Sequence, residues 1–466
     1  MRGIISAGGY VPFRRLQRAE IAKTFGSGGG KGTRSVASYD EDTTTMGVEA
    51  ARLALRGAPS GATPDALWFA TASPAYLDKN NASTLHAALR LDTDVAAFDF
   101  GGALRSGIGV LRAALDGADS VLVVTSDLRG GLPTSGDESA SGDGAGALLV
   151  GDDGNGPVIA EYLGAASATE EFLERWRTPG STRSRVWEER FGEVKYGPLV
   201  EQAWNAALKA AELSADQVAR VIVTGMHARA ARAVSARLGT AKEALVDDRS
   251  ATVGNTGSAH AALLLADTLE SAQTGQVIGL VVLADGADVL LFRTTDAVAS
   301  WRPSRSVDVQ LAAGSDVSYG KFLAWRGTLP VEPPRRPEPQ RISASAAGRK
   351  EDWKYAFVGG RNPETGEPQL PPLPESRDSV PMADLEGTIY TFTVDRIAYS
   401  PSPPIVFAVV DFDGGGRLPI ELTDTKVEDL SSGDRVEMTF RRLYTADGIH
   451  NYFWKARPVL TGAKEA

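Results

Sequence analysis

The sequence predicts an α/β protein in which one α/β unit is duplicated, followed by a small all-β domain. The motif Asp-Gly-Ala followed by a hydrophobic strand occurs twice, beginning at Asp143 and at Asp285. A helical pattern at 48–55 returns at 200–208, and a predicted strand follows each, at 66–70 and at 218–224. These repeats lie about 142 and about 152 residues apart, which indicates a duplicated unit of roughly 150 residues.

Composition sets limits on the class of protein. A chain of 466 residues is too long for one core and is expected to form two or three domains. The formal net charge of -10 argues against nucleic acid or an anionic membrane as the main partner, although a local basic patch suffices for an anionic ligand. We expect a cytoplasmic protein, because no apolar run is long enough to span a bilayer and the N-terminus lacks a signal-peptide pattern.

The two units are expected at 1–155 and 156–326. In the first, a short apolar strand at 3–7 precedes an amphipathic segment and a Gly-rich loop at 26–32. A helix then begins near Asp42, and a strand follows at 66–70. Buried strands with covering helices in both units predict two sheets stacked on shared helices, in five layers. Two unrelated doubly wound domains are the alternative.

Residues 327–380 are predicted to be a linker. Ten of the 25 prolines fall between Pro330 and Pro374, so helix and central strand are both disfavoured there. We expect this segment to lie along the surface of the first domain. A barrel is predicted within 381–466. It is formed by five strands, at 388–394, 405–412, 418–422, 435–443 and 452–456.

A strand-to-helix turn at 96–111 carries the first family resemblance. The strand that ends in Ala97-Phe98-Asp99-Phe100 breaks at a Gly-Gly pair and continues as a helix of small residues. It resembles the strand and turn that carry the acyl-accepting cysteine in the thiolase superfamily, in particular in archaeal-type 3-hydroxy-3-methylglutaryl-CoA synthases. The resemblance places that cysteine's position at Leu104. Because the chain contains no cysteine, condensation through an acyl-cysteine is excluded.

Two residues of the second unit match other functional positions of that family. His227 follows the strand at 221–224 and matches the histidine that polarises a substrate carbonyl or moves a proton. Asn255, in the loop Val253-Gly254-Asn255-Thr256-Gly257, matches the amide that orients a water or a carbonyl. The family's general-base glutamate falls at Ala72, so it is missing here.

Further candidates follow from the repeat and from the resemblance, although each, taken alone, is more often structural. Tyr76 and Tyr319 are hypotheses for a phenolic acid or base. The expected substrate-binding set is Leu104, Arg105, Ser106, Asp143, Gly257, Ser258 and Gly286. The four histidines lack metal-ligand spacing, so no metal site is expected.

The C-terminal part resembles the OB-fold domain that accompanies thiolase-like enzymes, with Ser400-Pro401-Ser402-Pro403-Pro404 as a mark. The segment 352–374 resembles the zinc ribbon that precedes such domains, in degenerate form, because cysteines are lacking. OB-folds also bind single-stranded nucleic acid, and the aromatic and basic side chains at 452–457 would suit that role or packing on a neighbour.

The resemblance implies an acyl-CoA carbon-carbon lyase or aldolase that acts on a 3-hydroxyacyl-CoA in steroid or lipid metabolism. Coenzyme A would enter as part of the substrate, with no other cofactor, and a homodimer through the thiolase-like part is expected, with or without an acyl-CoA-metabolising partner enzyme. The alternatives are a non-catalytic acyl-CoA-binding scaffold, which loss of both cysteine and glutamate favours, and a synthase-like condensing acyltransferase that uses another nucleophile, for example Ser106.

Overall fold

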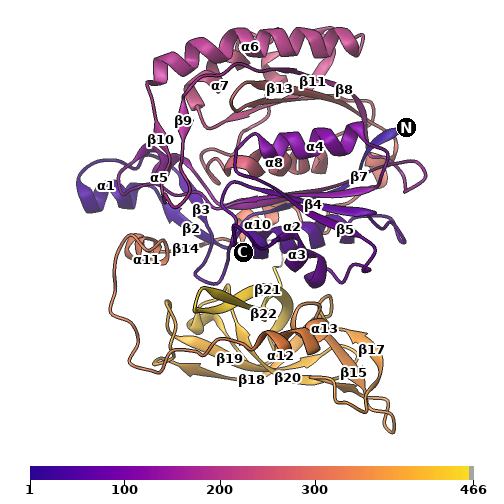
Figure 1. Cartoon of the computed structure of the whole chain (residues 1–466), viewed down its shortest axis with the longest axis vertical. Helices are drawn as coiled ribbons and strands as arrows, with labels where there is room; N and C mark the ends of the chain where they lie inside the picture. Colours follow the sequence, from indigo (N-terminus) through magenta and orange to yellow (C-terminus); the bar gives the residue numbers. More distant parts are fainter. Residues whose placement is uncertain (461–466) are drawn as a thin grey trace.

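The computed structural model describes residues 1–460, apart from the side chain of Glu189. Its α/β part has five layers, as the duplication predicts (Figure 1). Helices α4 (Ser106–Asp116) and α8 (His260–Glu270) lie between two layers of strands. Helices α2 (Thr43–Arg56) and α3 (Ala82–Ala88) cover one outer face, and α6 (Glu189–Ala210) and α7 (Ala228–Ser235) cover the other.

The strands of the two halves are joined at one edge. The order β11-β12-β13-β8-β1-β7-β6-β4-β5 forms a nine-stranded sheet instead of the two separate sheets that the sequence predicts. The link is short, because β1 and β8 pair only at Gly3 with Glu161 and at Ile4 with Ala160. The strand bounds, in sheet order, are Val218–Gly225, Val277–Leu283, Ala287–Thr294, Ala160–Ala168, Arg2–Tyr10, Gly144–Asp152, Val121–Asp127, Ala66–Thr71 and Ala96–Gly101.

The duplication is imperfect at one sheet edge. In the first half, β5 pairs in parallel with β4 along its whole length. In the second half, the equivalent of β5 is reduced to a single bridge between Leu245 and Val221. The segment that contains Leu245 continues without further strand pairing to the Asn255 loop.

Shorter elements complete the α/β part. The small sheet β14-β2-β3 and the ribbon β10-β9 lie outside the main sheet. Their bounds are Arg14–Gln17 (β2), Thr33–Val36 (β3), Arg175–Trp176 (β9), Arg185–Val186 (β10) and Ser315–Asp316 (β14). The remaining helices are Ala19–Phe25 (α1), Gly136–Ala140 (α5), Ala297–Ser300 (α9), Val307–Ala312 (α10) and Tyr319–Trp325 (α11).

The Pro-rich segment differs from its prediction in two respects. It contains two short helices, α12 (Ala344–Arg349) and α13 (Glu351–Lys354), which occupy a stretch without proline. It also lies against the barrel instead of the first domain, since Tyr444 donates a hydrogen bond to the carbonyl of Gln340 (3.2 Å). The segment that resembles a degenerate ribbon contributes β15 (Val358–Arg361) and β16 (Pro368–Gln369) to a three-stranded sheet, which β17 (Arg377–Pro381) completes.

The C-terminal domain is a closed barrel of five strands with the order β18-β19-β20-β22-β21. Their bounds are Gly387–Asp395, Ile405–Phe412, Arg417–Leu422, Ile449–Pro458 and Arg435–Ala446 in that order. The barrel packs on the outer helix layer, where Arg52 of α2 donates to the Met438 carbonyl (2.9 Å) and Glu49 accepts from the Phe440 backbone (3.1 Å). Figure 1 shows the barrel on the side of the molecule opposite to α6.

Charged side chains of the barrel are buried in this contact. Arg441 pairs with Asp424 (2.5 Å) and with Glu41, and Lys455 pairs with Asp40 (3.1 Å). Both cationic side chains have no exposed surface. Of the basic residues at 452–457, expected to suit nucleic acid or packing on a neighbouring subunit, Lys455 is instead buried in a contact within this chain. No helix within residues 1–460 is long and apolar enough to cross a membrane.

Candidate active site

Two adjoining clefts lie where the ends of β11 and β5 meet the segment between the halves. The outer cleft, of about 540 Å³, is walled by the ribbon β9–β10, by α5 and by the first turn of α7. The inner cleft, of about 240 Å³, contains the turn before α4. Glu174, Arg175, Ser184 and Met226 line both clefts.

The three residues on which the family resemblance depends come together around Met226. Leu104 lines the inner cleft, whereas His227 and Asn255 line the outer one. A small void of about 20 Å³ touches Leu104, Met226 and Asn255 together. The strand-to-helix turn of the first half therefore meets the two loops of the second half in one place.

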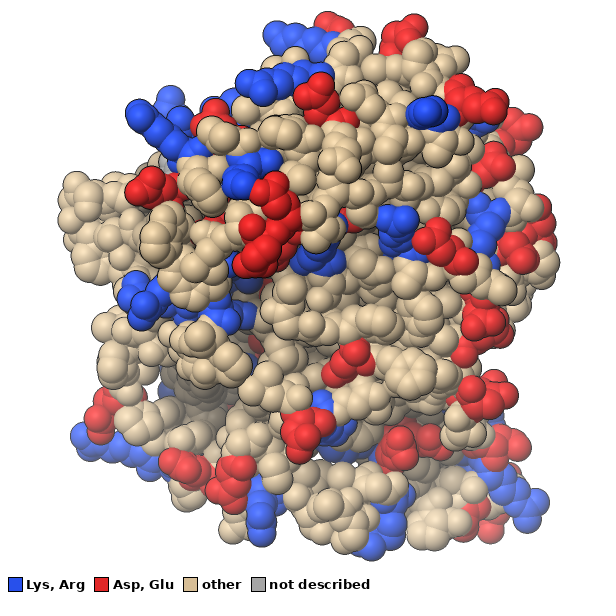
Figure 2. All heavy atoms as spheres, turned by 45° about the horizontal axis from the view of Figure 1, so that its top comes forward, with Lys and Arg blue, Asp and Glu red and all other residues tan. Residues whose placement is uncertain are grey.

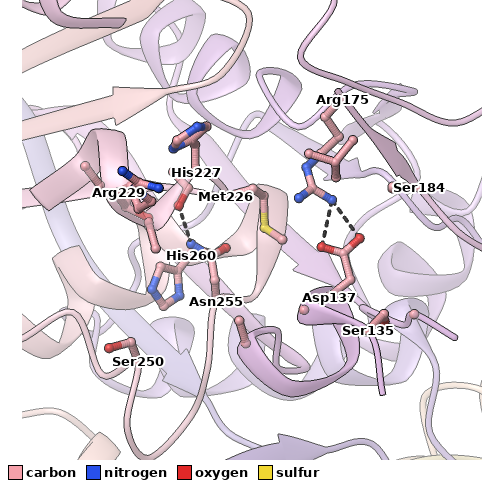
Figure 3. A pocket seen from close by; sticks show the side chains of 18 of the residues that line it. Ser135, Asp137, Arg175, Ser184, Met226, His227, Arg229, Ser250, Asn255 and His260 are labelled. Carbon is pink, nitrogen blue, oxygen red and sulfur yellow. Dashed lines mark hydrogen bonds and ion pairs between the residues drawn. The ribbon is translucent and has the colours of Figure 1, made fainter. Parts of the chain in front are cut away.

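His227 is the N-cap residue of α7 and is 7% exposed. Its Nδ1 accepts a hydrogen bond from the backbone N–H of Ala230 (3.0 Å). Because a backbone N–H is always the donor, Nδ1 carries no proton, and the neutral imidazole holds its proton on Nε2. This geometry favours donation from Nε2 to a carbonyl over acceptance of a proton, the two roles that the resemblance implies. Figure 3 shows the ring turned away from Asn255.

Asn255 holds its loop against the end of β11. Its Nδ2 donates to the Gly225 carbonyl (3.1 Å), and its Oδ1 accepts from the backbone of Gly257 (2.9 Å). Gly257 has a positive φ of 62°, and a Cβ there would stand 2.3 Å from Oδ2 of Asp127. Ser258 donates from its backbone to the same carboxylate (3.1 Å). Gly257 and Ser258 therefore shape the loop, and both also line the small void.

Three predicted substrate-binding residues lie beside the clefts without lining them. Arg105 binds Asp288 (2.8 Å) and the Asp285 carbonyl (2.8 Å), which uses its charge within the protein. Ser106 donates to the Gly101 carbonyl (3.2 Å) at the start of α4. Gly286 packs against Arg105, because a Cβ there would stand 2.8 Å from Nη1 of Arg105.

Asp143 is buried away from the clefts. It accepts from the backbone of Ala37 (2.7 Å) and of Arg129 (2.9 Å), and it pairs with Arg34 and Arg326. The repeat motif places it correctly at the start of β7, but these contacts give it a structural role.

The two candidate tyrosines do not line the clefts. Tyr319 donates to both carboxylate oxygens of Glu138 (2.9 and 3.0 Å), and burial followed by this hydrogen bond raises the pKa of the phenol. Tyr76 borders the barrel, where its hydroxyl accepts from the backbone of His450 (2.7 Å). Neither geometry supports an acid or base role.

Sequence reasoning missed the side chains that come from the segment between the halves. Glu174 and Tyr196 line the inner cleft together with Arg129 and Arg177. The Tyr196 hydroxyl donates to Oε2 of Glu174 (2.6 Å). No repeat signal marks these residues, because the first half has no equivalent of the segment; its only mark is a run of five arginines between 175 and 190.

Charged side chains and the imidazole of His260 line the outer cleft. Arg175 binds Asp137 through two hydrogen bonds (2.9 and 2.7 Å), which Figure 3 shows opposite His227. Burial lowers the pKa of His260 to about 4, so its imidazole is neutral. Within residues 1–460, no three or more His, Asp or Glu side chains are grouped to hold a metal ion.

Comparison with known proteins identifies the class of fold. The chain has a thiolase-like α/β fold with a C-terminal OB-fold domain. A solved structure of 3-oxoacyl-[acyl-carrier-protein] synthase III from Aquifex aeolicus VF5 covers 63% of this chain and 100% of its own, with a TM-score of 0.53 and 21% identity. The model of the C-terminal OB-fold domain of ChsH2 matches residues 379–441.

Among curated proteins, the chain has homologues that are hydroxymethylglutaryl-CoA synthases. The hydroxymethylglutaryl-CoA synthase of Pyrobaculum aerophilum is 28% identical over 344 residues, which are 70% of this chain and 97% of its own. That of Thermococcus sibiricus is 27% identical over 310 residues, 64% of this chain and 88% of its own. A structure of MvaS in complex with 3-hydroxy-3-methylglutaryl coenzyme A covers 73% of this chain and 94% of its own, at 23% identity and a TM-score of 0.57.

Proposed function

We propose that this protein is an acyl-CoA carbon-carbon lyase or aldolase that acts on a 3-hydroxyacyl-CoA without an acyl-cysteine intermediate. One observation carries the proposal: a chain without cysteine gathers Leu104, His227 and Asn255 around connected clefts. Retro-aldol cleavage needs a base for the 3-hydroxyl proton and donors for the enolate oxygen, but it needs no protein nucleophile.

His227 and Asn255 supply the donors in this proposal. In this proposal the amide of Asn255 stabilises the thioester oxygen as negative charge develops on it, and the Nε2–H of His227, whose ring is turned away from Asn255, donates to a different substrate oxygen. Both side chains are fixed by backbone hydrogen bonds, so little reorganisation accompanies the reaction. That no cofactor is needed beyond the coenzyme A of the substrate stays a prediction, as does a role in steroid or lipid metabolism.

The test is to incubate the purified full chain with short-, medium- and long-chain 3-hydroxyacyl-CoA thioesters and with 3-hydroxy-3-methylglutaryl-CoA. We expect a carbonyl product and a shortened acyl-CoA from at least one of them. Intact-protein mass spectrometry after incubation with acetyl-CoA is expected to show no covalent adduct. An acetylated protein would instead support the condensing acyltransferase with a replacement nucleophile.

A non-catalytic acyl-CoA-binding scaffold is the second candidate. Its support is that Leu104 and Ala72 occupy the positions that the resemblance gives to cysteine and glutamate, and both line the inner cleft. Binding of acyl-CoA by calorimetry without cleavage of any thioester tested would favour the scaffold, together with recovery of an active acyl-CoA-metabolising enzyme as its partner.

We also propose a homodimer through the edge of the main sheet. Strand β5 ends the strand order, and Phe98 on it is 55% exposed. An unpaired edge with an exposed aromatic side chain favours pairing with a second copy. Light scattering is expected to give a dimer for the wild type and a monomer for Phe98→Lys, whereas a dimeric Phe98→Lys would place the interface elsewhere.

A further inference from the structure

Glu174, which lies outside the repeat, lines the same cleft as Ala72, the position at which the family's general-base glutamate is missing. Ala72, Leu104 and Glu174 all line the inner cleft. Glu174 precedes the ribbon β9–β10, and its backbone carbonyl accepts from Trp187 (2.8 Å), which fixes it beside the ribbon. Its carboxylate therefore enters the cleft from the segment between the halves instead of from the strand β4.

The Glu174 carboxylate has a positioned partner. Tyr196, on α6, is 1% exposed and donates its hydroxyl proton to Oε2 of Glu174 (2.6 Å). Burial, followed by the neighbouring charge of Glu174, raises the pKa of Tyr196, so the phenol stays protonated and remains a donor. A carboxylate that is 7% exposed and hydrogen-bonded on one oxygen presents its other oxygen in a defined direction.

His227 stands close to the same carboxylate. Gly192 of α6 separates them, and a Cβ there would lie 2.9 Å from Nε2 of His227 and 3.3 Å from Cγ of Glu174. The rings of Tyr196 and His227 are 6.2 Å apart in an edge-on arrangement. Glu174, which lines both clefts, therefore stands between Tyr196 in the inner cleft and His227 in the outer one.

Three arginines also line the inner cleft, together with one further acidic residue, Asp285. Arg129 and Arg177 are two of these arginines, and burial, together with the charge of Arg129, lowers the pKa of Arg177. Arg129 is 4% exposed, and its Nε has no hydrogen-bond partner among the described residues. Guanidinium groups in this cleft favour a negatively charged reaction intermediate.

We propose that Glu174 is the general base of this site and that Tyr196 is its positioning residue; this rests on the proposed lyase function. Glu174 takes the proton of the 3-hydroxyl group of the substrate. The C2–C3 bond then breaks, its electron pair forms the thioester enolate, and the C3 oxygen becomes the carbonyl of the departing aldehyde or ketone. The protonated Glu174 returns the same proton to C2, so the acyl-CoA leaves and the carboxylate is restored.

The variant Glu174→Gln in the full chain tests whether Glu174 is the general base. The probe is the 3-hydroxyacyl-CoA thioester that the wild type cleaves fastest. We expect kcat to fall by about 10²–10⁴-fold with little change in KM. Exchange of the C2 hydrogens of acetyl-CoA in heavy water, measured by mass spectrometry, should fall with it, because the same base serves both steps. The matched control Glu171→Gln removes an exposed carboxylate from the same segment and should leave both rates unchanged.

Tyr196→Phe tests the positioning role. It should lower kcat by about ten- to a hundredfold while KM stays within about threefold, because a hydrogen bond to a charged group is lost. Tyr162→Phe is its control, since Tyr162 makes a similar hydrogen bond to Asp116 (3.0 Å) far from the clefts.

The outcomes separate the two proposals. If the wild type neither cleaves a thioester nor exchanges C2 hydrogens, the proposed function fails. If the wild type is active and a folded Glu174→Gln, checked by circular dichroism, keeps both activities, the assignment of Glu174 is wrong and the lyase remains. If Tyr196→Phe changes only KM, Tyr196 contacts the substrate instead of positioning Glu174.

Discussion

Some buried carboxylates of this protein line a cleft, whereas others serve only to hold the fold. Asp143 and Glu174 are both largely buried carboxylates, yet only Glu174 lines a cleft. Asp143 has four partners within the protein, two backbone N–H groups and two guanidinium groups, which leave it no capacity for a ligand. Hydrogen-bond partners, more than residue type, therefore decide which acidic side chain is available for catalysis.

Asp143→Asn is expected to destabilise the protein strongly. The substitution leaves the buried Arg34 without its counter-charge, and the loss of one member of a buried ion pair costs about 3–5 kcal/mol in the free energy of unfolding. Urea unfolding at pH 7 measures it. Asp153→Asn, which removes an exposed pair with the chain N-terminus, serves as the control and should cause no measurable change.

At the scale of elements, the site is made by helix ends and by one glycine in a helix. The N-terminus of α7 fixes His227, and α6 presents Gly192 to the same imidazole. Both helices belong to the outer layer farthest from the barrel (Figure 1). Their packing sets the position of the imidazole relative to Glu174.

His227→Ala is expected to lose both the N-cap of α7 and the Nε2 donor, whereas His227→Asn is expected to lose only the donor. Removal of the N-cap should lower the free energy of unfolding by about 0.5–2 kcal/mol, and asparagine, a good N-cap residue, should restore it. Asparagine lacks the Nε2 donor, so turnover should stay low in both variants. Urea unfolding and the thioester cleavage assay report the two effects separately, and full turnover in His227→Asn would contradict the role of the imidazole.

Gly192→Ala is expected to reduce turnover without unfolding α6. The added methyl group would lie 2.7 Å from Cδ2 of His227, so the imidazole must move. Gly197→Ala in the same helix is the matched control, because its methyl group would meet only the end of Arg237, at 3.6 Å. Equal activity in the two variants, at equal helix content by circular dichroism, would show that the position of His227 does not matter.

At the scale of the whole molecule, the barrel supports the α/β part and stands apart from the clefts. All residues that line the three spaces around Met226 lie between 18 and 285. The barrel contributes instead a buried network of ion pairs against α2 and the loop before it. Figure 2 shows acidic and basic side chains intermixed on the face turned toward α6, so the net charge of -10 is not concentrated on that face.

The ion-pair network predicts the response to acid. Burial opposes ionisation of Asp40 and Glu49, but Lys455 and Arg52 outweigh it and hold the pKa of each carboxyl at about 2. Because these values lie below the ordinary 3.8 and 4.5, the two groups stabilise the fold above about pH 5. That contribution is lost as the pH falls toward 2. Burial raises the pKa of Glu41, which acts in the opposite direction and offsets part of the loss.

Urea unfolding between pH 3 and pH 7 measures this response. Lys455→Met should cost about 3–5 kcal/mol at pH 7, because Asp40 loses its buried counter-charge, and its stability should depend less on pH. The wild type and the variant should each unfold with the barrel and the α/β part together, since the network joins them. Unchanged wild-type stability at pH 3 would contradict the role of these pairs.

The sequence by itself determined the order of elements and the residues of the repeat. Periodicity and turn signals located helices and strands close to their observed bounds, and β19 (Ile405–Phe412) lies where it was predicted. These signals are local, because strand alternation and helix caps depend on neighbouring residues. The resemblance at 97–99 and 253–257 likewise pointed to loops that the structure brings together around Met226.

Only the tertiary structure decided which side chains share the clefts. It joined the two sheets through β1 and β8, it turned Asp143 inward, and it carried Glu174 and Tyr196 to the turn at Leu104. Glu174 lies 70 residues from Leu104 along the chain and belongs to no repeat, so no local pattern connects them. Contacts between distant segments arise from the packing of whole layers, which a local sequence signal does not encode.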